Sequence, residues 1–280
     1  MDNDGYTVNA ARTVLTTGAN SGIGLATTLE LARRGFRSVG GVRSEEKARA
    51  VTEAAVRAGV RVETVLLDVT NVDECVQVID QLRPYGLVNN AGYPATGAIE
   101  DVDDREARRV LETMAVAPIR LARLALPHMT ALGIGRIVNV SSIYGRIATP
   151  LTGWYQAAKH ALEGVTDALR VEVASAGVHV VLVQPGGVQT RLWEGLEHQA
   201  ERLRGSSFDA AYERYVALLR WMQPYMQQPA GVAAVVGRAM TALLPRARYL
   251  VGCDAQLLLL AERFVPTVVR DRVTRLVLGL

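Results

Sequence analysis

Short apolar runs rich in β-branched residues alternate along this chain with longer stretches that have helical periodicity. The runs lack a strict apolar–polar alternation, which is typical of strands buried on both faces of a parallel sheet. Each connection between parallel strands has to cross a face of the sheet, so the helical stretches are expected to cover both faces. The pattern therefore predicts an α/β chain with a three-layer, doubly wound fold and a central parallel sheet of about seven strands.

The expected elements run through the whole sequence. Strands are predicted at residues 13–16, 37–42, 60–67, 87–89, 136–140, 178–183 and 249–251. Helices are predicted at residues 23–34, 45–57, 71–82, 105–132 and 155–174. The sequence has no internal repeat, low-complexity segment or break in composition, so residues 1–280 are expected to form a single domain.

Composition and charge argue against several classes of protein. The 31 Lys and Arg side chains are scattered among 28 Asp and Glu side chains, and a net charge of +3 leaves no basic footprint for a nucleic acid. The two cysteines, Cys75 and Cys253, form no CxxC or Cys/His cluster, so no metal site is predicted. The sequence shows no signal peptide and no run of about 20 apolar residues, so we expect a reduced, cytoplasmic setting.

The basic residues are almost all arginine. Only Lys47 and Lys159 are lysines, which leaves 31 − 2 = 29 arginines. Such a bias is expected of a GC-rich coding background in which arginine replaces lysine wherever either residue serves. A lysine that persists against this drift marks a position that arginine does not fill equally well, and Lys159 is a candidate for this reason.

A glycine-rich turn lies between the first predicted strand and the first predicted helix. After Thr17, its candidate cofactor contacts are Gly18, Asn20, Ser21, Gly22, Ile23 and Gly24. Glycines let a backbone turn tightly and approach a pyrophosphate, while a helix N-terminus supplies free N–H groups and a favourable dipole. A plain tight turn is the alternative, but the position between strand and helix favours a phosphate-binding turn in a Rossmann-like fold.

The spacing of this turn is GxxxGxG, with a threonine in front of the first glycine. It resembles the turn of the short-chain dehydrogenase/reductase family, specifically its compact single-domain branch. The resemblance implies an oxidoreductase that moves hydride between a nicotinamide cofactor and a carbonyl or alcohol. Ordered motifs extend the resemblance over residues 14–190, and in layout the chain is most similar to hydroxysteroid- and retinol-dehydrogenase-like members.

The end of the second predicted strand bears on which nicotinamide cofactor is bound. Val42 stands where NAD-binding members of the family carry an acid, and Arg43 and Ser44 follow it. An acid there would repel a 2′-phosphate, whereas a guanidinium suits a phosphate dianion through bidentate hydrogen bonds. A solvent-facing arginine is the alternative, and we predict NADP(H) as the cofactor.

Two further motifs follow the third and fourth predicted strands. In the family, an acid at the position of Asp68 lies against the adenine amine, with the residue at Val69 beside the ring. The sequence NNAG then resembles the family motif that lines the adenine side of the cleft, with Asn90, Ala91 and Gly92 as the expected contacts. Polar caps at the ends of the strands are the alternative for both motifs.

Tyr155 and Lys159 form a YxxxK pair near the start of a predicted helix. Residues i and i+4 share one helix face, so the ammonium can lie beside the phenol. A phenol with a pKa of ~10 is a poor acid–base group at neutral pH, and a nearby cation lowers that pKa. Ser142 precedes Tyr155 by the 13 residues that separate the family's serine and tyrosine, and a hydroxyl there can hydrogen-bond the substrate oxygen. Ser142, Tyr155 and Lys159 are the predicted catalytic residues, with Tyr155 and Lys159 also expected to contact the cofactor; Ser141 is expected to pack or cap.

After the sixth predicted strand, Pro185, Gly186, Val188 and Thr190 match the family's PGxVxT motif. The resemblance implies that this backbone holds the nicotinamide carboxamide, with Thr190 close to the amide or phosphate. A Pro-Gly turn without a ligand is the alternative.

One position departs from the family pattern. Many members carry an asparagine on the long central helix, where it helps a water reach the lysine. Counting back from the LPHM sequence at 126–129, that position is Met114. A thioether donates no hydrogen bond and accepts only weakly. Either the backbone carbonyl still holds the relay water while Met114 fills space, which we prefer, or the proton relay is slowed or rerouted.

Residues 191–228 correspond to the variable substrate lid of the family. Their large side chains are Trp193, Leu196, Phe208, Tyr212, Tyr215, Leu218, Leu219, Trp221, Met222 and Tyr225. These favour a bulky, lipophilic substrate, although the packing of two short helices explains them equally well. The other candidate pocket residues are Tyr144, Pro150, Trp154 and Gly187.

Residues 253–280 form an amphipathic C-terminal extension. It can cover the pocket, contact a second subunit or touch a membrane surface. Packing on the parent fold is preferred, with no firm membrane association. By analogy with the family, a homodimer or homotetramer is expected through the long central helix and the helix that carries Tyr155.

Three functions stay open at this point. The first is an NADP(H)-dependent ketone reductase or secondary alcohol dehydrogenase for a bulky lipophilic substrate, with Tyr155 as the acid–base group. The second is a 3-oxoacyl-thioester reductase, which needs a basic entrance that the mixed charges of residues 191–204 do not demand. The third is a non-catalytic NADP(H)-binding sensor, against which the intact Ser142, Tyr155 and Lys159 argue.

Overall fold

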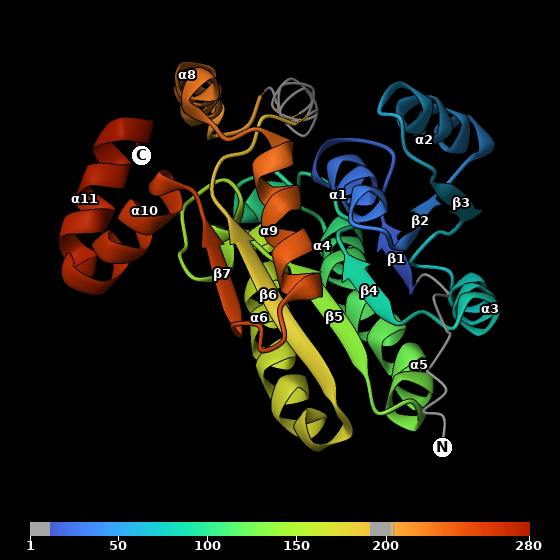
Figure 1. The fold of residues 1–280 in the computed structure, drawn as a ribbon. Coiled ribbons are helices and arrows are strands. Elements are labelled where there is room, and N and C mark those ends of the chain that lie inside the picture. The colour runs from blue at the N-terminus through green and yellow to red at the C-terminus, as the bar shows by residue number, and fades with distance from the viewer. Residues whose placement is uncertain (1–11, 191–202, 204) are drawn as a thin grey trace, which may run out of the picture.

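A single parallel sheet of seven strands forms the centre of the molecule, in the order β3-β2-β1-β4-β5-β6-β7 (Figure 1). The computed structural model describes residues 12–190, 203 and 205–280. The strands are β1 (Thr13–Thr17), β2 (Arg37–Val42), β3 (Glu63–Leu66), β4 (Gly86–Asn89), β5 (Gly135–Val140), β6 (Val178–Pro185) and β7 (Arg248–Val251). The strand order reverses between β1 and β4, which is the doubly wound, Rossmann-like arrangement that the sequence predicts.

Helices cover both faces of the sheet (Figure 1). One face carries α1 (Gly22–Arg33), α2 (Glu45–Arg57) and α9 (Pro229–Thr241). The other carries α3 (Val72–Leu82), α4 (Asp104–Leu111), α5 (Ala117–Ala131) and α6 (Gly153–Glu172). Beyond the sheet lie α8 (Asp209–Met222), α10 (Cys253–Phe264) and α11 (Thr267–Leu278). None of the described helices is long and apolar enough to cross a membrane.

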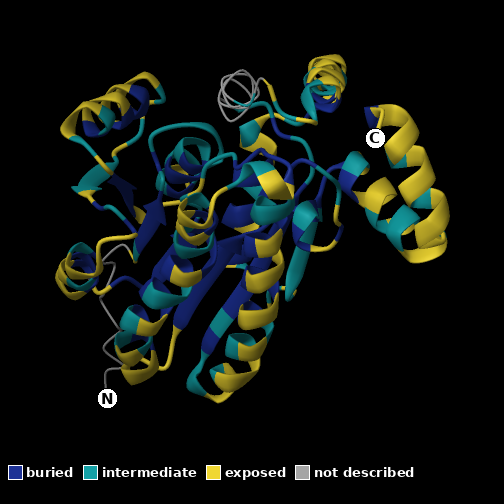
Figure 2. Cartoon of the chain, turned by 180° about the vertical axis from the view of Figure 1, so that it is seen from behind, coloured by how far each residue is buried: buried dark blue, intermediate teal, exposed yellow. Residues whose placement is uncertain are grey.

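The core consists of two apolar layers separated by the sheet, whose inner strands β2, β1, β4, β5 and β6 are almost wholly buried (Figure 2). Neighbouring residues of β1 serve different layers, because successive side chains point to opposite faces. Val14 packs with Leu31 and the α9 residue Val236, whereas Leu15 packs with the α5 residue Leu121. Burying each such side chain contributes about 1.5–3 kcal/mol. This double burial is why the strands show no apolar–polar alternation.

The third strand is shorter than predicted, because the residues just before it close the C-terminal end of α2 instead of pairing with β2. Gly59 has a φ of +65°, a left-handed conformation that closes a helix. The Val60 N–H then donates to the Ala55 carbonyl oxygen at 3.0 Å. Pairing with β2 therefore begins at Glu63, opposite Val39.

The long central helix is not a continuous α-helix. A π-helical turn, Glu112–Val116, separates α4 from α5. Pro118 follows it and has no N–H, so the Met114 carbonyl oxygen cannot receive the i→i+4 hydrogen bond of an α-helix. The widened turn thus lies at the position where the family carries its relay asparagine.

The C-terminal helices pack on the rest of the fold through few buried residues. Ala255 and Leu278 are the buried residues of α10 and α11, both of which are described in full. Leu278 packs with the α8 residues Tyr212 and Tyr215. The other apolar side chains of α11 are exposed, whereas Ala255 of α10 packs with Ile143 and Ile147. Figures 1 and 2 show the two helices beside β7.

Candidate active site

Two glycines of the turn between β1 and α1 stand where a side chain would not fit. Gly18 has a φ of +66°, and a Cβ atom on it would lie 2.9 Å from the Ala91 Cα atom. A Cβ atom on Gly24 would overlap the Gly18 carbonyl oxygen, because α1 packs directly on the turn. The turn therefore presents bare backbone to its surroundings, next to the N-terminus of a helix.

The NNAG residues hold this turn against the sheet. Asn90 Nδ2 donates to the Thr17 carbonyl oxygen at 3.0 Å. The Thr17 hydroxyl in turn accepts from the backbone N–H groups of Asn90 and Ala91, both at 3.0 Å. Asn89 contacts the sheet instead, because its Nδ2 donates to Asn139 Oδ1 of β5 at 2.8 Å. Asn90 thus supports the turn, and Asn89 joins two strands.

An open cleft of about 520 Å³ lies at the carboxyl ends of the central strands, where the strand order reverses. The predicted cofactor contacts that line it are Gly18, Asn20, Ser21, Gly22, Ile23, Gly24, Arg43, Asp68, Val69, Asn90, Ala91, Gly92, Tyr155, Lys159 and Thr190. Four predicted contacts that are described do not line it, namely Ser44, Pro185, Gly186 and Val188. The sequence motifs therefore converge on one place in the fold.

Two cations border the cleft at the end of β2. Arg43 lies in the loop after the strand and Lys47 in the first turn of α2. Ser44 has a different role from the predicted one, because its hydroxyl caps α2 by accepting from the Lys47 backbone N–H at 3.3 Å. The last residue of β2 is the buried and apolar Val42, so no carboxylate occupies the end of this strand. Both lysines of the chain consequently lie in the same cleft.

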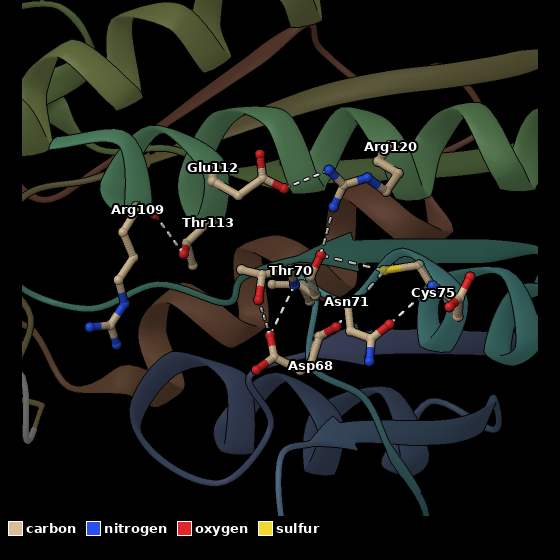
Figure 3. Close-up of polar contacts among 10 residues, drawn as sticks. Asp68, Thr70, Asn71, Cys75, Arg109, Glu112, Thr113 and Arg120 are labelled. Carbon is tan, nitrogen blue, oxygen red and sulfur yellow. Dashed lines mark hydrogen bonds and ion pairs between the residues drawn. The ribbon is translucent and has the colours of Figure 1, made fainter. Parts of the chain in front are cut away.

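Asp68 faces this cleft from the end of β3. Its Oδ1 atom accepts from the Thr70 backbone N–H at 2.9 Å and from the Thr70 hydroxyl at 2.7 Å (Figure 3). Burial opposes ionisation, but these hydrogen bonds and the nearby charges of Arg43 and Arg109 lower the pKa of Asp68 overall. The carboxylate is therefore held anionic, with a fixed orientation.

The neighbouring Val69 carbonyl is fixed from the opposite side. Arg120 Nη1 of α5 donates to it at 3.1 Å, and the Cys75 thiol lies 3.4 Å from it (Figure 3). Arg120 also pairs with Glu112 of the π-helical turn at 2.5 Å. The backbone at the predicted adenine side is thereby tied to the central helix.

The predicted catalytic side chains meet at the inner end of the cleft. The Lys159 Nζ atom lies 5.7 Å from the centroid of the Tyr155 ring and donates to the Val140 carbonyl oxygen at 2.9 Å. The Ser142 hydroxyl accepts from the Tyr144 backbone N–H at 3.2 Å and lies close enough to the Tyr155 hydroxyl to lower the pKa of that phenol. Ser142 does not line the cleft itself and reaches the site through Tyr155.

Burial controls the proton affinities of this group. It raises the pKa of Tyr155 to about 12, and the nearby Ser142 hydroxyl offsets this only in part. It lowers the pKa of Lys159 to about 8, against an opposing rise from the charge of Glu163. The expectation that Lys159 lowers the phenol pKa is not met in this arrangement, because the ammonium donates to Val140 and not to the phenol oxygen.

Ser141 and Met114 complete the inner end of the cleft. Ser141 Oγ is buried and has no hydrogen-bond partner among the described residues, so Ser142 is the serine that meets Tyr155. Met114 is buried, and a Cβ atom on Gly92 would lie 3.1 Å from its Sδ atom. Met114 thus packs against the NNAG loop and fills space there.

The family model described as short chain dehydrogenase matches residues 12–201, a stretch that contains the glycine turn, the NNAG motif, Ser142, Tyr155 and Lys159. The chain belongs to the short-chain dehydrogenase family. It is therefore an oxidoreductase of CH–OH and C=O groups that uses a nicotinamide cofactor.

Individual short-chain dehydrogenases match almost the whole chain. The uncharacterized oxidoreductase YusZ of Bacillus subtilis is 32% identical over 263 residues, which cover 90% of this chain and 93% of that protein. Retinol dehydrogenase 7 of Mus musculus is 29% identical over 276 residues, covering 92% and 86%. A variant of actinorhodin polyketide ketoreductase, solved with NADPH, superposes with a TM-score of 0.77 at 29% identity, covering 89% and 98%. The retinol dehydrogenase match agrees with the predicted likeness in layout.

In this short-chain dehydrogenase the segment Pro185-Gly186-Gly187 at the end of β6 is held by β7 and α10. The Gly186 N–H donates to the Val251 carbonyl oxygen at 2.9 Å. The Gly187 N–H donates to Asp254 Oδ2 at 2.6 Å, so the residue predicted for the substrate pocket uses its donor within the protein. Thr190 lies over the glycine turn, because a Cβ atom on Gly22 would come within 3.0 Å of its Cγ2 atom. Asp254 carries no motif that marks it in the sequence.

Aromatic side chains surround Tyr155 on the side away from the glycine turn. The rings of Tyr144 and Tyr155 meet edge to face, with centroids 6.3 Å apart. Burial raises the pKa of Tyr144, and Thr149 and the α8 residue Tyr215 lie close enough to its hydroxyl to offset part of that rise. Trp154 packs beside Tyr155 in one apolar cluster. Trp193 lies outside the described residues.

Helix α8 is anchored by polar contacts of Tyr212. Its hydroxyl donates to Asp101 Oδ2 at 2.6 Å and accepts from the Ala98 N–H at 2.6 Å. Trp221 and Tyr225, which the sequence places in the substrate lid, are exposed and pack on each other with centroids 5.9 Å apart. Only part of the aromatic content of residues 191–228 therefore faces the active site.

A second hollow of about 710 Å³ lies beside the cleft, and Tyr93 and Arg109 border both. The rest of its lining is Ala95, Thr96, Asp101, Val102, Asp103, Arg105, Glu106 and Leu203. Most of these side chains are polar or charged, so this hollow is not the apolar pocket expected for a lipophilic substrate.

Sequence reasoning missed several residues of the main cleft. They are Gly41, Lys47, Leu67, Thr70, Tyr93, Pro94, Arg109, Glu112, Thr113 and Val140. Lys47 has a signal in the rarity of lysine in this chain. Arg109 and Thr113 share one helix face by their i, i+4 spacing, but the sequence does not reveal that this face turns toward the NNAG loop.

Proposed function

We propose that this chain is an NADP(H)-dependent reductase of ketones, or a dehydrogenase of the corresponding secondary alcohols, for a bulky lipophilic substrate. The observation that carries the proposal is the meeting of Ser142, Tyr155 and Lys159 at the end of a cleft whose other wall is the glycine turn. A carbonyl substrate needs a proton donor and a nucleotide site side by side, and this arrangement supplies both.

The residues of the cleft fit a dinucleotide. Gly18 and Gly24 occupy positions where a Cβ atom would strike backbone, which leaves the turn free for a close approach by a pyrophosphate. The N-terminus of α1 supplies N–H groups for the phosphates. Asp68 and Val69 would hold the adenine, and Thr190 would contact the nicotinamide end. The bound cofactor supplies the hydride, or accepts it in the reverse direction.

The charges at the end of β2 favour NADP(H) over NAD(H). Arg43 and Lys47 both border the cleft there, and the strand itself ends on an apolar residue, Val42. A 2′-phosphate would gain two cationic partners, and no carboxylate at the strand end would repel it. We propose that Arg43 and Lys47 together select the phosphorylated cofactor.

Binding titrations test this cofactor selection. In the double variant R43A/K47A, the NADPH dissociation constant should rise about tenfold to a hundredfold, since a hydrogen bond to a charged group contributes about 1.5–3 kcal/mol. NADH affinity should change little. The matched control is Arg49→Ala, which removes an exposed arginine of the same helix that does not line the cleft. A preference for NADH in the wild type, or unchanged NADPH binding in R43A/K47A, would contradict the assignment.

The chain's own groups divide the acid–base work. The Ser142 hydroxyl would hydrogen-bond the substrate oxygen together with Tyr155, so that negative charge developing on this oxygen is shared. In the reduction direction, Tyr155 gives its proton to that oxygen. A buried phenol with a pKa of about 12 is protonated at neutral pH and is therefore ready to donate. We propose that the Lys159 hydrogen bond then turns from the Val140 carbonyl oxygen to the phenolate that remains, so that the ammonium stabilises it.

The substrate class follows from the groups around Tyr155. Tyr144, Trp154 and the α8 residue Tyr215 supply aromatic surface on that side. Such surface favours a substrate with a large apolar body next to its carbonyl. The similar proteins include a retinol dehydrogenase and a polyketide ketoreductase, and both names agree with bulky substrates.

A panel of carbonyl compounds tests the reaction. Purified protein with NADPH should reduce bulky cyclic and aromatic ketones with a higher kcat/KM than acetone-sized ones. A 3-oxoacyl thioester belongs in the panel, because the likeness to a polyketide ketoreductase keeps thioester reduction as the second candidate. Preference for the thioester would replace the ketone proposal. Tight NADPH binding without turnover of any compound would indicate a sensor.

We also propose that the chain is a cytoplasmic homo-oligomer. Val116 and Val165 are exposed on the central helix and on α6, the surfaces that the family resemblance suggests for assembly. Both cysteines are free, which suits a reducing compartment. Light scattering on purified protein should give a mass of two or four chains, and a single-chain mass would contradict the assembly.

A further inference from the structure

Lys159 is a buried ammonium that donates a hydrogen bond to a neutral group, the Val140 carbonyl oxygen. Taking an ammonium out of water is costly unless an opposite charge lies nearby. The residue that could supply this charge is not part of any family motif considered above. It is Glu163, one helical turn after Lys159 on the same face of α6.

Glu163 is buried, and its carboxylate is paired with a residue of β7. Its Oε2 atom accepts from Arg248 Nε of β7 at 3.0 Å, and its Oε1 atom has no hydrogen-bond partner in the described part of the chain. Arg248 is shared with Asp167, which also pairs with Arg170 at 2.9 Å. Two guanidiniums and two carboxylates form this network, and within the described residues it leaves one oxygen of Glu163, Oε1, without a hydrogen-bond partner.

Glu163, Ser141 and Lys159 come together at Gly145. A Cβ atom on Gly145 would lie 2.9 Å from Glu163 Cγ, 2.7 Å from Ser141 Oγ and 3.2 Å from the Lys159 carbonyl oxygen. The carboxylate thus stands behind the catalytic segment, on the side away from the cleft. No ion pair joins it to Lys159 among the described residues, so the two charges act on each other through space.

We propose that Glu163 is the positioning residue that keeps the Lys159 ammonium charged beside Tyr155. Other titratable or charged groups line the same cleft or contact Tyr155 or Glu163. Those of the cleft are Tyr155, Arg43, Lys47, Asp68, Tyr93, Arg109 and Glu112; Tyr144 contacts Tyr155, and Arg248 of β7 pairs with Glu163. Within the described structure, Glu163 is the group whose charge raises the pKa of Lys159 against burial.

The consequence for catalysis rests on the proposed function. An ammonium that loses its proton cannot stabilise the phenolate of Tyr155. Without the charge of Glu163, burial alone sets the pKa of Lys159, and the amine becomes neutral at a lower pH. Asp167 pairs with the same Arg248 but lies one turn further along α6, so it should have no such effect.

The small number of lysines makes a direct measurement possible. Protein labelled with ¹³C at lysine Cε contains two such signals, from Lys47 and Lys159. Lys47→Arg assigns them, and the chemical shift against pH gives the titration midpoint of Lys159 without any cofactor or substrate. The wild type should titrate near the pKa of about 8. In Glu163→Gln the midpoint should fall by about one unit.

The control variant is Asp167→Asn, which removes a carboxylate from the same Arg248 and should leave the Lys159 midpoint in place. Glu163→Asp keeps the charge and should stay closer to the wild type than Glu163→Gln does. If Glu163→Gln fails to fold, Glu163→Met, which also removes the charge, takes its place. An unchanged midpoint in Glu163→Gln, or an equal fall in Asp167→Asn, would overturn the proposal.

The pH dependence of kcat provides a second test. The kcat for carbonyl reduction should fall as the pH rises through the Lys159 midpoint, and in Glu163→Gln this fall should move to lower pH by the same shift that the NMR signal shows. A shifted NMR midpoint without any turnover would contradict the proposed reaction and leave the role of Glu163 intact. A shifted rate profile with an unshifted NMR midpoint would contradict the role of Glu163.

Discussion

The buried Lys159 ammonium lowers the stability of the folded protein, although the proposed reaction uses its charge. Burial lowers its pKa from an ordinary 10.5 to about 8, so the folded protein binds this proton less tightly than the unfolded chain does. Below about pH 8 the ammonium is charged in both states, and the full cost of burying it is present. Between about pH 8 and 10.5 the folded form loses its proton first, and the cost disappears as the pH rises.

Lys159→Met should therefore be more stable than the wild type at neutral pH, by roughly 2 kcal/mol, since a pKa change of one unit corresponds to about 1.4 kcal/mol and the lost contacts offset part of the gain. Urea unfolding at a series of pH values measures this difference. The gap between the two proteins should close as the pH approaches 10.5. A variant that is less stable than the wild type at neutral pH would show that the Val140 hydrogen bond and the Glu163 charge outweigh the cost of burial.

Single residues were predictable from sequence where a motif fixes both their type and their place. Gly18, Gly24 and Asn90 fall in this group, since their backbone geometry or side-chain contacts tolerate few alternatives. The pKa of Tyr155 was not predictable, because it depends first on how deeply the folded chain buries the phenol. Asp254 was missed because its partner, Gly187, lies 67 residues away in the sequence.

Elements were predictable where local signals bound them. Helix α2 begins after its Ser44 cap and ends at Arg57 as expected, with Gly59 close behind. The π-helical turn escaped prediction, because the periodicity of the long helix continues across it and only Pro118 marks the missing hydrogen bond. This turn lies where Met114 replaces the relay asparagine, and it supports the preferred interpretation that a backbone carbonyl, rather than a side chain, serves the relay.

Helix α8 depends on Tyr212 for its attachment beside the active site. Tyr212→Phe removes the hydrogen bond to Asp101 and leaves the buried Ala98 N–H without its acceptor, at a cost of about 1–3 kcal/mol. Amide hydrogen exchange within α8 should therefore become about tenfold faster or more, while exchange in the central strands should stay unchanged. The KM for a bulky ketone should rise with it.

Tyr225→Phe is the matched control for this experiment. It removes a hydroxyl from the end of the same segment, but Tyr225 is 78% exposed and should leave α8 exchange as it is in the wild type. Equal protection of α8 in Tyr212→Phe and the wild type would mean that apolar packing against Leu278, rather than the Tyr212 hydroxyl, holds the helix in place.

At the scale of the whole molecule, the order of the strands determines where the site lies. The parallel sheet brings the ends of β1, β2, β3, β4 and β5 together at the reversal in strand order, so motifs from Gly18 to Lys159 come to line one cleft. The sequence predicts this convergence, because strands alternate with helices along the chain. It does not predict the exposed α10 and α11, since an amphipathic helix has the same periodicity whether its apolar face is covered or open.

Tyr155 is the proposed acid of an NADPH-dependent carbonyl reductase. Single-turnover mixing of NADPH-loaded protein with its best ketone from the panel measures this step directly. Tyr155→Phe keeps the ring and should bind NADPH as the wild type does, yet oxidise it at least about a thousandfold more slowly, because general acid catalysis contributes about 10²–10⁴. A rate within tenfold of the wild type, at equal NADPH affinity, would contradict the assignment of Tyr155.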